Sequence, residues 1–547
     1  MKKTRISRLL SLLLACLMLV GCMAELVACA DTEGSGTSAP TQTPAPDDQD
    51  SDIVESAVAS ETETETEEEG EEVETEVETE VETEVETEED PFENVDYQKR
   101  PFRILTSTNI ASPGMGNSNF LIEGEKDAVT NIVNDAVATR NSVVENKIGV
   151  TLEFTQLDVA YTGVFDKIRT YASAGLDEFD LVINDIFPFA NLSIEGNFRN
   201  VLDPEFTGFD FENKPYWYTE YMDDMCLVEG YEYILAGDFF IDILRSAHLL
   251  LFNKNMYQTL HGNADPNEVY EWVENYEWTY EKMLEMIQGA YQDKNANGEK
   301  DYGDVYGFAI LELWGSSIGL VVSADPGFVT RDEDGTLTIT LGEDNRASDL
   351  TEYLTKLAYD ENACFGLTSD AQILQDFTDG LSLICDYQRL GSLENAVLKD
   401  MKDGFGVLPC PMLYASDHKY NTATHDTTEV GAILQTSHDA EFVSTVIQVL
   451  NRETATELMP KYYGEALQVQ YVTDPYASQM IQIIHDNISV SFILAYNNQL
   501  GTTVLNTFSN AVAEKRTFEV VYKPIGKTIG RKMNSMIKTF KKKNHIS

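Results

Sequence analysis

Alternating runs of apolar and polar residues between positions 101 and 185 predict strands separated by helices. The strand candidates are short apolar runs at residues 101–107 (PFRILTS), 150–157 (VTLEFTQL) and 179–185 (FDLVIND). Between them, residues 135–149 and 164–175 place apolar side chains at helical spacing, and both stretches end in glycine. This alternation predicts an α/β fold in which helices cover both faces of a mostly parallel sheet. Ligands of such sheets bind beyond the carboxyl ends of the strands, which are residues 106–109 and 184–187 here.

The first residues carry the pattern of an export signal rather than that of a folded element. Four basic residues precede an apolar run over residues 9–20, which is too short to span a bilayer comfortably. The run ends in LVGC, which resembles the lipobox of bacterial lipoproteins, so Cys22 is the expected lipidation site and residues 1–22 the signal peptide. Two alternatives remain: the later match LVAC, which ends at Cys29 and puts the signal's end at residue 28, and secretion without a lipid.

Residues 23–96 are predicted to be a disordered acidic tether. Positions 31–95 contain 26 acids and no Lys or Arg, and their Val-Glu-Thr-Glu period is low in complexity. Like charges along such a segment repel one another and extend it.

The charge of the remaining chain excludes several classes of ligand. The formal net charge is −55, of which about −32 lies on residues 96–547. So acidic a folded part argues against nucleic acid and anionic membranes as ligands. The exception is the tail from position 515 on, which has ten basic residues and one acid. We expect this tail to be a solvated helical face, with contact to an anionic wall or lipid surface as the alternative.

The folded part contains four cysteines, Cys226, Cys364, Cys385 and Cys410. They show no CxxC spacing and no accompanying histidine pattern, which argues against zinc. Isolated buried thiols are expected, and one disulfide is the alternative for a protein outside the cell.

Five stretches in a fixed order resemble the extracellular solute-binding proteins (family 1, sugar type) of bacterial ABC importers. They are LFNK at 251–254, WTYEKM at 278–283, FTDGLSLI at 377–384, FGVLPCPM at 405–412 and VGAILQTSHDAEF at 430–442. In that family the first stretch opens the second lobe and the fourth is the return hinge. The resemblance covers nearly all of residues 97–510, whereas the tail beyond it matches no motif of the family.

The resemblance implies a two-lobe, periplasmic-binding-protein-like fold (type II) with hinge crossovers. Lobe 1 would comprise residues 97–243 plus 413–455, and lobe 2 residues 244–412 plus 456–547. It also implies a monomeric, non-enzymatic receptor that captures an oligosaccharide outside the membrane and delivers it to ABC permease subunits by hinge closure. The lipid anchor and the long tether would place it on the extracellular face of the membrane, and favour a Gram-positive host.

Other functions remain as alternatives to sugar capture. They are a receptor for peptides or acidic solutes and a non-transport surface adhesin. An enzyme is disfavoured, because the sequence contains no GxSxG, HExxH or phosphate-loop motif.

The candidate ligand residues follow strands or lie at the first crossover, where a clamshell receptor encloses its solute. Acids, amides and arginines can bind sugar hydroxyls, and aromatic rings can cover sugar rings. The candidates are Asn184, Asp185, Phe187, Asp238, Phe239, Arg245, Glu312, Trp314, Asp386, Tyr387 and Arg389. For the acids and arginines an ion pair is an equal alternative, and Phe239 is also expected to pack in a core. Arg245 and Arg389 could instead hold a carboxylate or phosphate, which would favour an acidic ligand.

Residues 293–304 (DKNANGEKDYGD) have the pattern of a calcium-binding loop. Oxygen-bearing side chains alternate along it, and a glycine stands sixth, where the loop must turn sharply. The proposed ligands are Asp293, Asn295, Asn297, Glu299 through its carbonyl, Asp301 and Asp304. An Asp at the twelfth position resembles dockerin loops more than sensor EF-hands. Because the loop is single, we expect structural Ca2+ distant from the ligand, with a metal-free turn as the alternative.

Overall fold

The computed structural model describes most of the chain beyond residue 89, and residues 86–547 form one compact unit. The described residues are 90–109, 119–124, 132–212, 214–311, 317–367, 370–394, 396–425, 427–463, 475–489, 492–500 and 504–546. The predicted signal, both candidate lipidation sites and nearly all of the predicted tether lie outside these ranges.

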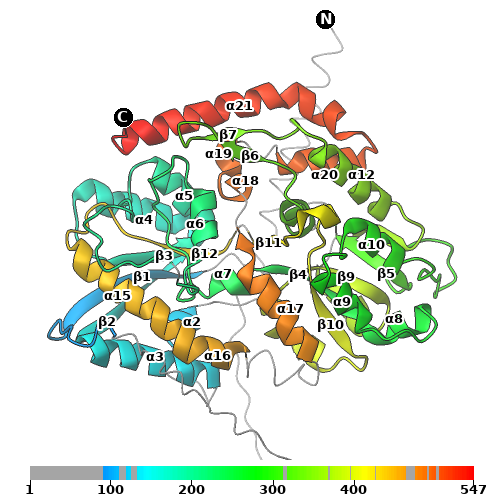
Figure 1. The fold of residues 1–547 in the computed structure, drawn as a ribbon, viewed down its shortest axis with the longest axis horizontal. Helices are drawn as coiled ribbons and strands as arrows, with labels where there is room; N and C mark the ends of the chain where they lie inside the picture. Colours follow the sequence, from blue (N-terminus) through cyan, green and yellow to red (C-terminus); the bar gives the residue numbers. More distant parts are fainter. Residues whose placement is uncertain are drawn as a thin grey trace, which may run out of the picture. The chain divides into compact units, whose positions relative to one another are not determined.

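The first sheet contains four strands in the order β12-β3-β1-β2 (Figure 1). They are β1 (Arg100–Asn109), β2 (Val150–Ala160), β3 (Leu181–Asp185) and β12 (Glu429–Ala432). β1 pairs in parallel with β2 and β3, whereas β12 runs antiparallel to β3. The three strands predicted from residues 101–185 are therefore confirmed.

The second sheet contains five strands in the order β10-β4-β9-β5-β8. They are β4 (His248–Asn253), β5 (Tyr306–Leu311), β8 (Ala363–Leu367), β9 (Ser382–Arg389) and β10 (Phe405–Pro409). β8, β5 and β9 run parallel, but β4 is antiparallel to both β9 and β10. Each sheet thus has one reversed strand, β12 or β4, and each of these follows a passage of the chain from the other sheet. The sheets are mixed for this reason.

Helices cover the two sheets and define two halves of the fold. Around the first sheet are α2 (Asn119–Ile122), α3 (Ile132–Ile148), α4 (Tyr161–Ala174), α5 (Ile186–Ile194), α15 (Ala440–Glu453), the π-helical η4 (Thr454–Leu458) and α16 (Met459–Lys461). Figure 1 shows α4 and α5 on one face of this sheet and α3 with α15 on the other. We call the first sheet with these helices the first half. The predicted helices at 135–149 and 164–175 are confirmed as α3 and α4.

The second half consists of the second sheet and the helices packed on it. They include α8 (Lys254–Leu260), α9 (Glu268–Glu274), α10 (Tyr280–Met286), α12 (Arg346–Ala358), α13 (Asp370–Thr378), α14 (Ala396–Lys399) and α17 (Pro475–Asp486). Thr279 caps α10, because its hydroxyl accepts from Lys282 N at 3.3 Å. The indole of the neighbouring Trp278 donates to Pro409 O at 2.9 Å. Two of the stretches that carry the family resemblance therefore meet in the core of this half.

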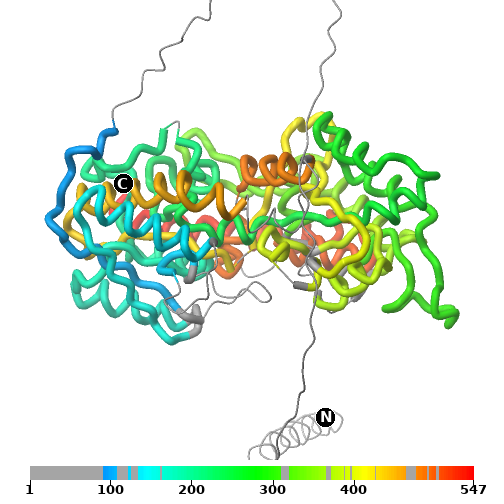
Figure 2. The backbone as a smooth tube through the Cα atoms, turned by 90° about the horizontal axis from the view of Figure 1, so that it is seen from below, coloured from blue at the N-terminus to red at the C-terminus, as the bar shows by residue number. Residues whose placement is uncertain are grey.

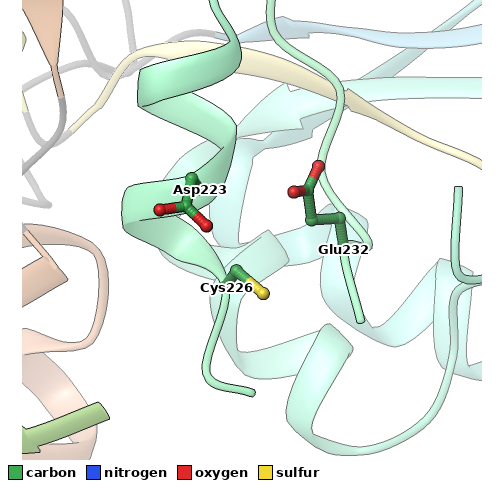
Figure 3. A group of neighbouring side chains, drawn as sticks. All are labelled: Asp223, Cys226 and Glu232. Atoms are coloured by element: carbon green, nitrogen blue, oxygen red, sulfur yellow. The ribbon is translucent and has the colours of Figure 1, made fainter. Parts of the chain in front are cut away.

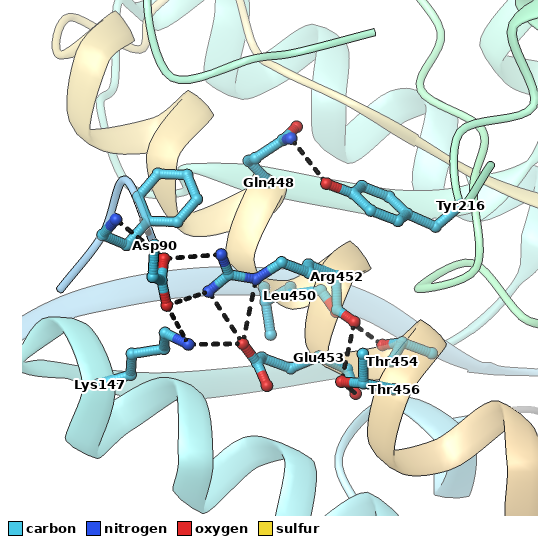
Figure 4. Close-up of polar contacts among 10 residues, drawn as sticks. Asp90, Lys147, Tyr216, Gln448, Leu450, Arg452, Glu453, Thr454 and Thr456 are labelled. Carbon is cyan, nitrogen blue, oxygen red and sulfur yellow. Dashed lines mark hydrogen bonds and ion pairs between the residues drawn. The ribbon is translucent and has the colours of Figure 1, made fainter. Parts of the chain in front are cut away.

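The described chain begins with a segment fastened onto α15 and α3. In Figure 2 this segment is the blue tube beside the gold-coloured α15. Asp90 is the centre of the contact (Figure 4): Arg452 Nη1 lies 2.8 Å from its Oδ1, and Lys147 Nζ lies 2.6 Å from its Oδ2. Glu453 accepts from the same two cations at 3.0 and 3.2 Å. The alternating charges hold the first described residues against α15 and α3.

The carboxyl-terminal elements are α18 (Phe492–Ala495), α19 (Asn497–Leu500), α20 (Leu505–Ala513) and the long α21 (Phe518–Lys543). One face of α21 is buried and includes Phe518, Ile529, Met533 and Phe540. The tail is thus a helix, as predicted, with exposed cations such as Lys527 on its outer face. The prediction missed that its apolar face packs against the body.

Two further observations concern the chemistry of the whole described part. Its four cysteines are buried and free, which confirms the expectation of isolated thiols. No helix among the described residues combines the length and the apolar composition that crossing a bilayer requires.

Candidate functional site

Buried polar side chains gather where the chain passes between the two sheets. Thr106 lies near the end of β1, and Asn184 and Asp185 are the last two residues of the neighbouring β3. All three side chains are buried. Asp185 stands opposite Glu429, the first residue of the returning strand β12. The site therefore begins at the carboxyl edge at which the sequence predicts a ligand.

The first passage between the sheets contributes a second group of polar residues. The short helix α7 (Asp242–Arg245) is followed by Ser246 and then by β4, whose first residue is His248. The segment before β12 joins this passage to β3, because His425 N donates to Ser246 O at 3.1 Å and Ile186 N donates to Thr428 O at 2.8 Å. Residues from β1, β3, the passage and the return therefore share one region.

Three buried oxygens in this region lack a protein partner. Among the described residues, Thr106 Oγ1, Asn184 Oδ1 and Ser246 Oγ accept and donate no hydrogen bond. Burying a polar group without a partner costs about 1–3 kcal/mol, so native proteins rarely keep such groups unless water or a ligand satisfies them. These three atoms are therefore the best-supported ligand contacts of the described chain.

A buried ion pair fixes the passage to the second half. Arg245 is fully buried, and its Nε and Nη2 each lie 3.0 Å from an oxygen of Glu394 in η2 (Leu390–Glu394). Asp242 lies 3.5 Å from the same guanidinium, and its other oxygen accepts from Glu429 N at 3.0 Å. Burial lowers the pKa of Arg245, but Glu394 more than compensates, so the net shift is upward. This bidentate pair holds α7, β12 and η2 in one arrangement.

His248 of the passage is uncharged, and its ring stacks on that of His425. Burial, with smaller contributions from His425 and Arg389, holds the pKa of His248 well below its ordinary value. His248 is therefore an uncharged donor and acceptor at neutral pH. Its ring stacks on that of His425 with 5.9 Å between centroids. Arg389, at the end of β9, stands opposite His248 in the sheet and is buried as well.

The structure places the predicted ligand residues in several different surroundings. Asn184, Asp185, Arg245 and Arg389 lie in the region described above, and Phe187 follows it, half-buried, on α5. Asp386 is buried in β9. Glu312 and Trp314 lie outside the described residues, as does the side chain of Tyr387, whose backbone belongs to β9.

Asp238 and Phe239 lie in different surroundings. Asp238 accepts from the hydroxyl of Tyr218 at 2.8 Å and lies 3.6 Å from His485 Nε2. Phe239 is fully buried, and the guanidinium of Arg140 lies 5.0 Å from its ring centre. Phe239 thus packs in the core of the first half, which agrees with the packing alternative for this residue.

Sequence reasoning missed several residues of the region. Ser246, His248, His425 and Glu429 were not among the candidates. The sequence signal that could have found them was their position next to predicted strands. Ser246 and His248 interrupt the apolar run just before the crossover strand, and the polar run HDTTE precedes the return strand.

The predicted calcium loop is a closed turn between α10 and β5. Asp293 accepts from the backbone N of Asn297 and Gly298 at 3.2 and 2.9 Å, and Gly298 has the positive φ of 80° that its sixth position demands. Asn297 Nδ2 donates to Asp301 at 2.8 Å. Asp304, the predicted twelfth ligand, is buried and accepts from Lys294 N at 3.1 Å and Tyr291 OH at 3.3 Å. The oxygen donors of the loop suit Ca2+, and its binding stays a prediction.

A second group of possible metal ligands lies at the end of α6 (Thr219–Met225). Figure 3 shows Asp223, Cys226 and Glu232, whose ligand atoms lie within 4.8 Å of one another. Arg331 already occupies the acidic side of this group, with its Nη2 2.9 Å from Asp223 Oδ1. The thiol of Cys226 donates to Val228 O at 2.9 Å. We therefore interpret the group as a structural contact between α6 and the segment that carries Arg331.

Comparisons with known proteins bear on the fold. No family model matches the chain, and no curated protein matches its sequence. In structure it is similar to the sugar-binding protein MalE of Xanthomonas citri, with 11% identity, 81% of this chain and 99% of that one covered, and a TM-score of 0.52. It is also similar to an uncharacterised protein of Listeria monocytogenes EGD-e, with 13% identity, 80% of this chain and 100% of that one covered, and a TM-score of 0.53.

A third similar structure belongs to an ABC transporter. It is the galacto-N-biose-/lacto-N-biose I-binding protein of the ABC transporter from Bifidobacterium longum, in complex with lacto-N-biose, with 13% identity, 81% and 98% coverage and a TM-score of 0.50. At such identities the likeness establishes the architecture of two sheets and their crossovers. The chain therefore has the two-domain, periplasmic-binding-protein-like fold of ABC substrate-binding proteins.

Proposed function

We propose that this protein is the solute-binding receptor of an ABC importer, which captures a carbohydrate outside the membrane and delivers it to a permease unchanged. The observation that carries the proposal is a set of buried oxygens at the passage between the two sheets, Thr106 Oγ1, Asn184 Oδ1 and Ser246 Oγ, which have no partner within the described part of the chain. The similarity in fold to sugar-binding proteins of ABC transporters supports the same proposal.

The chemistry of the region suits sugar hydroxyls. A hydroxyl donates one hydrogen bond and accepts others, so it needs acceptors and donors side by side. The amide of Asn184 and the carboxylate of Asp185 supply acceptors, and the guanidinium of Arg389 supplies donors. Phe187 and Trp314 are the proposed platforms for a sugar ring.

Capture would use closure of the two halves about their crossovers. We place lobe 1 at residues 97–243 plus 413–455 and lobe 2 at 244–412 plus 456–547, as the sequence predicts, except that η4 and α16 pack on α3 in the first half. A ligand that contacts both halves binds the closed state better and so shifts the equilibrium toward it. The closed form would then dock on the permease as a monomer, and the cycle includes no covalent step.

The proposed location is the outer face of the cell membrane. A lipid on Cys22, or on Cys29, would anchor the receptor, and residues 23–96 would separate it from the bilayer. The length of this acidic stretch supports a Gram-positive cell wall as its setting.

The test is a thermal-shift screen followed by calorimetry. A ligand at a hundred times its Kd raises the free energy of unfolding by about 2.7 kcal/mol, which a melting curve detects readily. We expect neutral oligosaccharides to raise the Tm and to bind in the calorimeter. If neither neutral sugars nor uronates bind, the sugar proposal is wrong.

A receptor for acidic solutes or peptides is the second candidate. The buried guanidinium of Arg389 favours it, because arginine binds carboxylates through two parallel hydrogen bonds. The same screen separates the two candidates, since uronates or peptides would then bind while neutral sugars would not.

A further inference from the structure

The two halves are connected not only by the chain passages between the two sheets but also by elements outside the sheets, a hairpin and a long helix. The hairpin of β6 (Val329–Arg331) and β7 (Leu337–Ile339) follows the second sheet's strand β5 in the chain, yet it binds the segment after α6. This segment belongs to the first half, because it continues through Tyr233 to Leu235, which bridges Gly431 of β12. Leu337 N donates to Leu227 O at 3.2 Å, and Glu229 N donates to Gly335 O at 2.9 Å. Arg331 adds its contact to Asp223 at 2.9 Å.

Helix α21 makes the longest of these connections, and its first turn belongs to the second half. Phe518 packs on Phe508 of α20 with 5.2 Å between ring centroids. α20 packs in turn on α12, which contacts β8 of the second sheet. Glu519 accepts from Ser348 of α12.

The last turn of α21 belongs to the first half. The ring of Phe540 meets that of Tyr233 edge-on at 5.5 Å. Asn544 Nδ2, just past the helix, donates to Ser193 O of α5 at 3.0 Å. Backbone packing is equally close, since a Cβ on Gly196 would stand 2.8 Å from Lys543 O. α5 itself begins directly after Asp185, at the candidate site.

The helix therefore crosses from one half to the other over a long span. Phe518 and Phe540 are 22 residues apart, which is about 33 Å along an α-helix. In Figure 1 the red α21 runs from beside α20 and α12 across to α5 and α19.

A cavity with charged walls lies beside α6 and the hairpin strand β6. Its volume is about 460 Å3, and its walls include Glu220 and Asp224 of α6 on one side and Arg346 and Asp417 on the other. Val322, Phe328, Val329 and Phe492 contribute apolar side chains to the same walls. The hairpin and α21 connect the halves beside this cavity, and an ion pair between Lys419 and Glu220 adds to them.

We propose that α21 is a strap that limits how far the two halves separate, and that its attachment to α5 is the releasable end. The first turn is held by stacked aromatic rings, Phe508, Phe518 and Tyr522. The last turn is held by the Phe540–Tyr233 ring pair, by the Asn544–Ser193 hydrogen bond and by the packing of Lys543 on Gly196, and Lys541 donates to Thr336 Oγ1 of the hairpin at 3.3 Å. Removing the second attachment should free the hinge without removing the helix.

The experiment measures the separation of the halves in the full chain without any ligand. Spin labels are attached through a ketone-bearing amino acid at two exposed positions, 174 on α4 and 258 on α8, so that no cysteine is used. Pulsed electron resonance then gives the distribution of label-to-label distances. We expect a narrow distribution for the natural sequence and one about two-fold broader, with a longer mean, for Phe540→Ala with Asn544→Ala.

The matched control is Lys538→Ala with Lys542→Ala, two exposed residues of the same turns. It should leave the distribution unchanged. Circular dichroism verifies folding, and Asn544→Ala alone decides the question if the double variant does not fold. A distribution that stays narrow in a folded variant, or that broadens equally in the control, would overturn the strap. Because no solute is present, this result does not depend on whether the ligand is a sugar.

Discussion

Single polar atoms carry the functional argument at the scale of residues. A buried hydroxyl that bonds to protein stabilises the fold, whereas one without a partner weakens it until a ligand arrives. Ser444 and Ser246 represent the two cases within one protein. Ser444 Oγ accepts from Gly208 N at 2.9 Å and donates to Ala440 O at 2.7 Å, while Ser246 Oγ has no partner among the described residues.

This contrast predicts opposite effects of the same substitution. Ser246→Ala should leave the free energy of unfolding unchanged or slightly higher, and should weaken solute binding by about 1–2 kcal/mol, which is roughly ten-fold in Kd. The control Ser444→Ala should lower the free energy of unfolding by about 1 kcal/mol and leave Kd unchanged. Urea unfolding and calorimetry measure both quantities. Equal losses of stability in the two variants would contradict the assignment of Ser246.

His485 gives a pH dependence at the same scale. Burial lowers its pKa, but Asp238 at 3.6 Å and Asp486 at 2.9 Å raise it by more, so the net shift is upward. Tyr218 and Tyr463 cover the imidazole with their rings. A raised pKa in the folded state stabilises the protein fully below the ordinary pKa near 6.5 and ceases to do so as the pH rises through the folded-state value.

The natural sequence should therefore be more stable than His485→Gln at pH 5.5, and this difference should shrink by pH 8.5. Urea unfolding at the two pH values measures it. His438→Gln, an exposed histidine in the first half, serves as the control and should show little difference at either pH. A difference that is independent of pH would exclude the charged pair.

At the scale of elements, the loop at 293–304 is a candidate for a calcium staple between α10 and β5. Extracellular calcium modules bind with Kd values of about 10⁻⁴–10⁻³ M, so millimolar Ca2+ should raise the Tm and a chelator should lower it. Asp301→Ala should abolish this response, because Asp301 is the oxygen donor that Asn295 and Asn297 already face. Asp400→Ala, an exposed acid elsewhere, should retain it. If neither calcium nor the chelator changes the Tm, the loop is a metal-free turn.

The segment of residues 90–97, which is fastened onto α15 and α3, is a second element that can be tested, here by changing the pH. Burial raises the pKa of Asp90, but Arg452 and Lys147 lower it by more, to well below the usual range. A lowered pKa stabilises the fold above the ordinary value near 3.8 and is lost as the pH falls toward the folded-state value. Asp90→Asn should thus be less stable than the natural sequence at pH 7, with the difference shrinking below about pH 4.

Urea unfolding at pH 7 and pH 3 measures this effect. Asp439→Asn is a useful comparison, because Asp439 also pairs with an arginine, Arg100, but caps α15 in addition through Phe442 N. Its loss of stability should persist in part at low pH, because a cap needs an oxygen acceptor rather than a charge. A penalty for Asp90→Asn that is as large at pH 3 as at pH 7 would exclude the ionic anchor.

Elements differed in how far the sequence predicted them. The strands and helices from 101 to 185 were predictable because their apolar spacing is set by burial on the sheet. The reversed strand β4 was not, because its run LLLF fits a parallel strand equally well and only the passage before it sets its direction. Ser246 and His248 were missed for a related reason: their polarity becomes informative only once that passage is known to border the candidate site. The apolar face of α21 was overlooked because the ten cations from position 515 on dominate the composition of the tail.

For the whole molecule, the site and the acidic amino-terminal region occupy different parts of the chain. The residues of the candidate site lie between Thr106 and Glu429. Removing residues 31–85 should therefore leave Kd unchanged in calorimetry. Uptake by intact cells should fall, since the proposed receptor would then stand closer to the bilayer; equal uptake would refute a spacing role for the segment.

The four cysteines of the folded part have a consequence of a different kind. Burial raises the pKa of Cys226 to about 11 and that of Cys410 to about 12, and it also raises those of Cys364 and Cys385. Oxidants and electrophiles attack the thiolate, which these four sulfurs do not form at physiological pH. These four cysteines should thus resist peroxide and alkylating reagents in the folded protein, and none of them needs a thiol oxidase to reach its described state.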